Sequence, residues 1–124
     1  MTGRLVVEDP SKPADTRFLH VLQGADNATF ADPSTIVQSA AGTAFDGAVI
    51  LDTAVFFAFD LNTLFQGTTL LVPATVAHVF ITGLAPATGY GVTAIDVPGG
   101  VQIQLTVGGQ TATTDAAGVL NIAL

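Results

Sequence analysis

Apolar and polar residues alternate with a period of two from one end of the chain to the other, and this pattern restricts the fold most. Apolar residues at i, i+3, i+4 and i+7 never persist for three helical turns. Because successive residues of a strand point to opposite faces, the pattern predicts strands and no helix. We expect strands at residues 4–8, 17–23, 34–40, 45–51, 53–60, 68–72, 77–82, 90–96, 101–107, 110–115 and 119–124.

Turn-forming residues separate the expected strands at short intervals. Gly, Pro, Asn and Asp gather at residues 9–15, 24–33, 97–100, 107–109 and 115–118, where the backbone must leave the strand conformation. Many short strands at this spacing are typical of a sandwich or a barrel. The chain has 124 residues and no internal repeat or linker. We therefore expect one all-β domain over residues 1–124, built as a two-sheet antiparallel β-sandwich.

The only tyrosine of the chain lies in the stretch "GLAPATGY", in which Leu84, Pro86, Thr88 and Tyr90 occupy alternate positions. This order is typical of a tyrosine corner, where the leucine enters the core and the tyrosine hydroxyl folds back onto upstream backbone. It resembles the fibronectin type III signature at the crossing between the two sheets. We expect a buried Tyr90 whose hydroxyl bonds to backbone near residues 84–87. The resemblance implies a fibronectin III or immunoglobulin-like sandwich with extra strands.

Charged residues are scarce and mostly acidic. They make up 10% of the chain against 49% hydrophobic residues, and the net charge is −7 with only three basic side chains. A chain that cannot form a basic patch is a poor partner for nucleic acid or for an anionic membrane surface. No apolar run approaches the roughly 20 residues of a spanning helix, so we expect neither nucleic acid nor membrane as a partner. The absence of cysteine leaves the redox compartment open.

A wider resemblance covers most of the chain. The segments at residues 17–26, 47–50, 54–61, 78–92 and 113–124 look like the all-β C-terminal appendage of bacterial heparinase II/III-like polysaccharide lyases. In those enzymes other domains carry catalysis, and none of their catalytic residues has a matching position here. The resemblance implies an extracellular or periplasmic accessory module, part of a larger protein, whose partner is the catalytic domain of that protein.

Few residues suggest a metal site. His20 and His78, the only histidines, both fall inside expected strands, 17–23 and 77–82, which would be neighbours in a fibronectin-like sheet. Zinc ordinarily takes three or four protein ligands, so we expect hydrogen-bonded histidines on a sheet face and no metal. The aspartates gather in turns without the spacing of a calcium-binding loop. We expect them to cap turns, and a weak calcium site remains an alternative.

Catalytic residues are not evident. No serine lies in a Gly-x-Ser-x-Gly elbow, and most acidic residues lie in or beside expected turns, where they face solvent. Paired carboxylates for glycoside chemistry are not excluded by spacing, since they meet only in three dimensions. We expect no enzymatic activity and no cofactor. The lack of tryptophan argues against a sugar-binding function, although a weak carbohydrate-binding module stays a third alternative.

The phenylalanines offer contact residues for a protein partner. Phe56 and Phe57 are adjacent in the strand "TAVFFAFD", so one ring should enter the core and the other should face outward. Phe30 and Phe65 lie in expected loops, as core plugs or as contacts. With few charges to protect strand edges, such a chain invites association. The alternative to the accessory module is therefore an independent extracellular structural or adhesive protein that self-associates as a dimer or a fibre.

Overall fold

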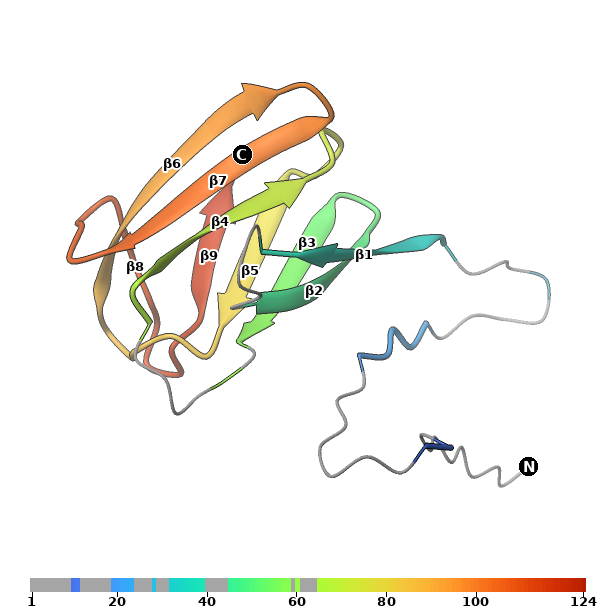
Figure 1. The fold of residues 1–124 in the computed structure, drawn as a ribbon, viewed down its shortest axis with the longest axis horizontal. Helices are drawn as coiled ribbons and strands as arrows, with labels where there is room; N and C mark the ends of the chain where they lie inside the picture. Colours follow the sequence, from blue (N-terminus) through green and yellow to red (C-terminus); the bar gives the residue numbers. More distant parts are fainter. Residues whose placement is uncertain are drawn as a thin grey trace.

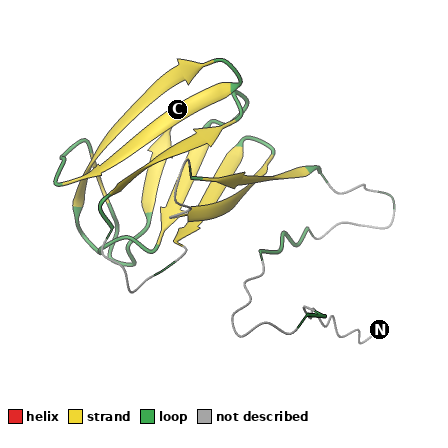
Figure 2. Cartoon of the chain, in the orientation of Figure 1, coloured by secondary structure: helices red, strands yellow, loops and turns green. Residues whose placement is uncertain are grey.

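The computed structural model describes residues 10–11, 19–23, 28, 32–39, 45–58, 60 and 65–124. These residues form strands joined by turns and contain no helix (Figure 2). The strands are β1 (Ser34–Gln38), β2 (Phe45–Ile50), β3 (Thr53–Ala58), β4 (Gly67–Val72), β5 (His78–Thr82), β6 (Gly89–Val97), β7 (Gly100–Val107), β8 (Ala112–Thr113) and β9 (Leu120–Ala123).

The strands form two sheets. The five-stranded sheet has the order β1-β2-β3-β5-β9, and the four-stranded sheet has the order β4-β7-β6-β8. Figure 1 shows the two sheets as layers, with β4 of the four-stranded sheet crossing in front of β5 and β9 of the five-stranded sheet. The expectation of an all-β, two-sheet sandwich is confirmed.

One pair of neighbours is not antiparallel. β3 and β5 run parallel, with Ala54 opposite Val79 and Phe56 opposite Ile81. The connection between them explains this, because the chain crosses to the other sheet to form β4 and then returns. Parallel neighbours need such a crossover, whereas antiparallel ones need only a hairpin.

The core lies between the sheets and follows the alternation of the strands. In the five-stranded sheet an inward row crosses all five strands, and its members are buried: Val37, Gly47, Phe56, Ile81 and Leu120. The four-stranded sheet contributes a second set of buried residues from β4 and β7: Leu70, Val72, Val101, Ile103 and Leu105. Burying such side chains stabilises the fold by about 25 cal/mol for each Å² removed from water.

The end of β1 joins the two sheets along one side. Ser39 forms an isolated antiparallel bridge with Leu70 of β4. Its backbone N–H donates to the carbonyl of Phe45 at 3.0 Å, and its hydroxyl accepts a bond from the Phe45 N–H at 3.1 Å. The sandwich is therefore closed at this corner, and the buried hydroxyl of Ser39 is satisfied there.

The expected strand at residues 17–23 is wrong in its described part. Residues 19–23 belong to no strand, and the neighbours of β5 are β3 and β9. Alternation reports only that a segment has one apolar side, and here the apolar side chains of Leu19, Val21 and Leu22 line a cavity instead of joining a sheet. The expected strand at residues 4–8 lies outside the described residues.

Candidate functional site

The crossing from β5 to β6 is fixed by Tyr90. The side chain is 2% exposed, and its hydroxyl accepts a hydrogen bond from the backbone N–H of Ala85 at 3.1 Å. Leu84 is also buried, and its N–H donates to the carbonyl of Gly118 at 3.2 Å. The structure thus places Tyr90 and Leu84 as the corner pattern predicts, and their role is to hold the backbone between the sheets.

Pro86 and Thr88, the other two corner residues, form the exposed part of the turn. The Thr88 hydroxyl donates to the carbonyl of Pro86 at 2.9 Å. Between them Ala87 adopts a positive φ of 48°, and its N–H donates to the carbonyl of Asp115 at 3.0 Å. These bonds orient the turn that leads into β6 and carry no reactive group.

Thr114 is a structural residue of the corner that sequence reasoning missed. This buried hydroxyl donates to the carbonyl of Ala85 at 2.7 Å and accepts a bond from the Thr88 N–H at 2.9 Å. A buried hydroxyl must be paired to avoid a desolvation cost, and here it links the segment after β8 to the crossing. Threonine is ordinary in a strand-rich sequence, so nothing in the pattern marks this one as buried.

Asp115 caps the turn that follows Thr114. Its carboxylate Oδ1 accepts bonds from the N–H groups of Ala117 at 2.8 Å and Val119 at 2.9 Å. Asp and Asn commonly bond to backbone two residues ahead in such turns. The expectation that aspartates cap turns is confirmed for this residue.

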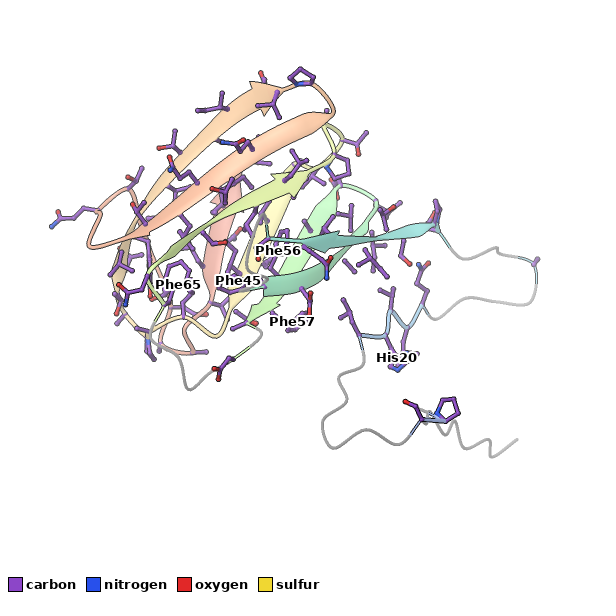
Figure 3. All side chains as sticks on the ribbon, viewed as in Figure 1. His20, Phe45, Phe56, Phe57 and Phe65 are labelled. Carbon is purple, nitrogen blue, oxygen red and sulfur yellow. The ribbon has the colours of Figure 1, made fainter. Side chains whose placement is uncertain are left out.

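Phe65 packs inside the sandwich. Its ring meets that of Phe45 edge-on, with centroids 5.7 Å apart, and that of Tyr90 with centroids 5.9 Å apart. Figure 3 shows Phe65 and Phe45 together at the interior. Edge-to-face pairs contribute about 0.5–1.5 kcal/mol beyond burial. Phe65 therefore acts as a core plug in this structure, and Phe30 lies outside the described residues.

Phe56 and Phe57 point to opposite faces of β3, as the sequence predicts. Phe56 is fully buried, whereas Phe57 is 46% exposed on the outer face. Gly47 on β2 lies opposite Phe56, and a Cβ at Gly47 would clash first with the backbone carbonyl of Val55 and would also approach Cδ1 of Phe56 to 2.9 Å. The absent side chain leaves room for the inward ring, and only Phe57 remains available for an external contact.

The outer face of the five-stranded sheet carries an aligned apolar row. Strand register places Ile36 opposite Ala48, Ala48 opposite Val55, and Val55 opposite Phe80. Ile36 is 78% exposed, and the other three are partly exposed. Together with Ile50 and Phe57 on the same face, this row forms a surface that we call the apolar outer face: Ile36, Ala48, Ile50, Val55, Phe57 and Phe80.

Polar residues border the apolar outer face along β1 and β2. Gln38 lies opposite Asp46, and its Nε2 donates to Asp46 Oδ1 at 2.8 Å. At the other end of the apolar outer face, Thr53 of β3 lies opposite Ile50 of β2 on one side and opposite His78 of β5 on the other. An apolar centre with a polar rim is the usual anatomy of a protein–protein contact surface.

The outer face of the four-stranded sheet has a different chemistry. Its cross-strand partners are mainly threonine and glutamine, with Thr69 opposite Gln104 and Gln104 opposite Thr93. Leu71 and Ile95 are its exposed aliphatic residues, and Gln102 of β7 separates them. Only the five-stranded sheet therefore presents a continuous apolar row across four strands.

The two histidines are both exposed. His78 is on β5 opposite Thr53 and Ala123, while His20 lies in the segment of residues 19–23. Among the described residues no three His, Asp or Glu side chains are grouped so that they could hold a metal ion.

Comparisons with protein-family models, curated proteins and solved structures gave no significant match to the chain. The likeness to polysaccharide lyase appendages therefore remains a prediction. No helix able to cross a membrane is present in the part of the chain that the structure describes.

Proposed function

We propose that this chain is a non-catalytic structural module that acts by packing the apolar outer face against another protein surface. The observation that carries the proposal is the aligned row Ile36, Ala48, Val55 and Phe80, which remains partly exposed to solvent. Monomeric proteins rarely leave a large contiguous apolar patch in water, and such patches mark interaction sites.

The composition of the surface supports a protein partner. Phe57 supplies an aromatic anchor of the kind that dominates binding energy at interfaces, and Gln38 and Asp46 provide a polar border. The face is a sheet surface, which suits packing against another sheet. In a sandwich, aligned sheets pack through interdigitating side chains about 10 Å apart, and the same geometry is available between two molecules.

Two partners fit this chemistry. In the first case the module is an accessory domain of a secreted carbohydrate-active enzyme, and the apolar outer face packs on the catalytic domain in the extracellular space or the periplasm. In the second case the chain is an independent structural or adhesive protein, and the partner is a second copy. In both cases we expect the isolated chain to self-associate through this face, since no separate partner protein is present in solution.

The proposal assigns no catalytic residue, metal or cofactor to the chain. It is supported by the hydrogen bonds through which several polar side chains stabilise the fold. Asp115 bonds to turn backbone, Asp46 accepts from Gln38, and Thr114 bonds to the corner.

Sedimentation equilibrium of the isolated chain tests the proposal. The test variant is Phe57→Asp, and the matched control is Leu71→Asp, because Phe57 and Leu71 are each 46% exposed but lie on opposite outer faces. We expect the unmodified chain and the Leu71 variant to associate equally, and the Phe57 variant to associate at least about tenfold more weakly, as expected when an aromatic hot spot is lost. A monomer at every concentration, or equal association of all three proteins, would contradict the proposal.

A further inference from the structure

A segment of the chain outside the sandwich faces part of the apolar outer face. Leu19, Val21 and Leu22 of this segment line a cavity of about 460 Å³ together with Val55 and Phe57 of β3. The other lining residues are His20, Ala48, Ile50, Leu51, Asp52 and Thr53. Figure 3 shows His20 of this segment beyond Phe57, on the side away from Phe45 and Phe65.

The C-terminal end of the segment is tied to the entrance of β1. The Gln23 side chain donates from Nε2 to the carbonyl of Asp32 at 2.7 Å, and its Oε1 accepts a bond from the Asp32 N–H at 2.8 Å. The Gln23 amide thus bonds to both backbone groups of Asp32, as a paired residue does in an antiparallel sheet. These bonds keep residues 19–22 close to the five-stranded sheet, although these residues join no strand.

The segment and the sheet face are chemically alike but not in full contact. Leu22 is 82% exposed and Leu19 is also exposed, and the cavity separates the segment from the sheet. Burial of apolar surface favours closing such a gap. A tethered segment binds the face without the loss of translational entropy that a separate molecule incurs, because the tether gives the segment a high effective concentration.

We propose that residues 19–23 form a displaceable cover for the apolar outer face, with Leu19, Val21 and Leu22 as its apolar side and the Gln23–Asp32 pair as its tether. This inference rests on the proposed function, since it describes how the same surface is regulated. The cover and a protein partner require the same residues, above all Val55 and Phe57, so they exclude one another. Closing the cover weakens association, and releasing it strengthens association.

The first test weakens the cover directly in the full chain. The double variant Leu19→Asp/Leu22→Asp makes its apolar side charged, and Leu71→Asp/Ile95→Asp is the matched control, with the same added charge on the other outer face. Carbene labelling of Phe57 in dilute, monomeric protein should rise in the first variant and stay unchanged in the control. This readout needs no association, so it separates the cover from the proposed function.

The second test removes the tether without adding charge. Gln23→Ala deletes both bonds to Asp32, and Gln110→Ala is the control at an exposed position. Only the uncovered fraction of the molecules can bind a second copy, so a cover that is closed most of the time lowers the apparent affinity in proportion to that fraction. Gln23→Ala should therefore tighten self-association about fivefold. The control should not change it.

Each outcome decides the matter. If labelling of Phe57 is unchanged in both Leu19→Asp/Leu22→Asp and Gln23→Ala, the inference is overturned. It is also overturned if labelling of Phe57 rises in these variants without a change in their self-association, while Phe57→Asp abolishes association. Weaker association of the Leu19/Leu22 variant than of its control would show that the segment belongs to the contact with a second copy, which also overturns it. If Phe57→Asp leaves association unchanged while labelling of Phe57 rises, the proposed function fails and only the covering contact is retained.

Discussion

The N–H of Ala85 donates a hydrogen bond of 3.1 Å to the hydroxyl of Tyr90, five residues later in the chain. This bond closes the crossing that carries the chain from β5 in one sheet to β6 in the other. The ring of Tyr90 is buried against Phe65, so the same side chain fixes the backbone at one end and fills the core at the other. The corner therefore sets how the two sheets face each other.

Removing the corner hydroxyl should weaken the fold modestly. We expect Tyr90→Phe to lower the free energy of unfolding by about 1 kcal/mol, the usual net contribution of one such hydrogen bond. The ring and its packing remain, so the fold should be unchanged. Urea unfolding measures the effect, with Thr93→Val at an exposed position of β6 as the control. Equal stability of the Tyr90 variant and the unmodified chain would show that the bond contributes nothing.

The buried threonine of the corner should matter more than the tyrosine hydroxyl. Thr114→Val keeps the volume but removes the partner of the Thr88 N–H and of the Ala85 carbonyl. Unsatisfied buried groups cost about 1–3 kcal/mol each, and we expect a loss of about 2 kcal/mol. Thr113→Val is the neighbouring control, because Thr113 is exposed on β8. Unfolding of both variants at the same urea concentration would contradict this role of the Thr114 hydroxyl.

The packing of Phe56 against Gly47 predicts coupling between the two positions. Gly47→Ala places a Cβ against the Phe56 ring and the backbone of Val55, and overpacking typically costs about 1–3 kcal/mol. A smaller residue at position 56 relieves part of the clash, so Gly47→Ala/Phe56→Leu should lose less stability than the sum of the single variants. Thermal unfolding of the four proteins measures this coupling, and strict additivity would refute it.

Much of the strand framework follows from the sequence, because it depends on local pattern. β7 matches the stretch "VQIQLTV", where alternation is strongest, and turn formers such as those at residues 97–100 mark the hairpin between β6 and β7. The Tyr90 bond is also predictable, since the corner involves residues close together in the chain. The opposite orientations of Phe56 and Phe57 follow from the period of the strand alone.

The candidate surface was only partly predictable, because it depends on register between distant strands. The sequence indicates that Phe57 faces outward, but the alignment of Ile36 with Phe80 requires the parallel pairing of β3 and β5. Alternation also fails for residues 19–23, where the apolar side chains line a cavity over a sheet face. Thr114 gives no signal, since burial of a polar group is a property of the assembled fold.

Residue-level carbene footprinting of the unmodified chain at low and high concentration tests most directly whether the apolar outer face is the protein contact surface. Both outer faces carry exposed aliphatic or aromatic residues, so each provides a reporter within one sample. Labelling of Ile36 and Phe57 should fall as the chain associates, while labelling of Leu71 and Ile95 should stay constant. Association with unchanged labelling of Ile36 and Phe57, or with protection of Leu71 and Ile95 instead, would contradict the assignment of this face as the contact surface.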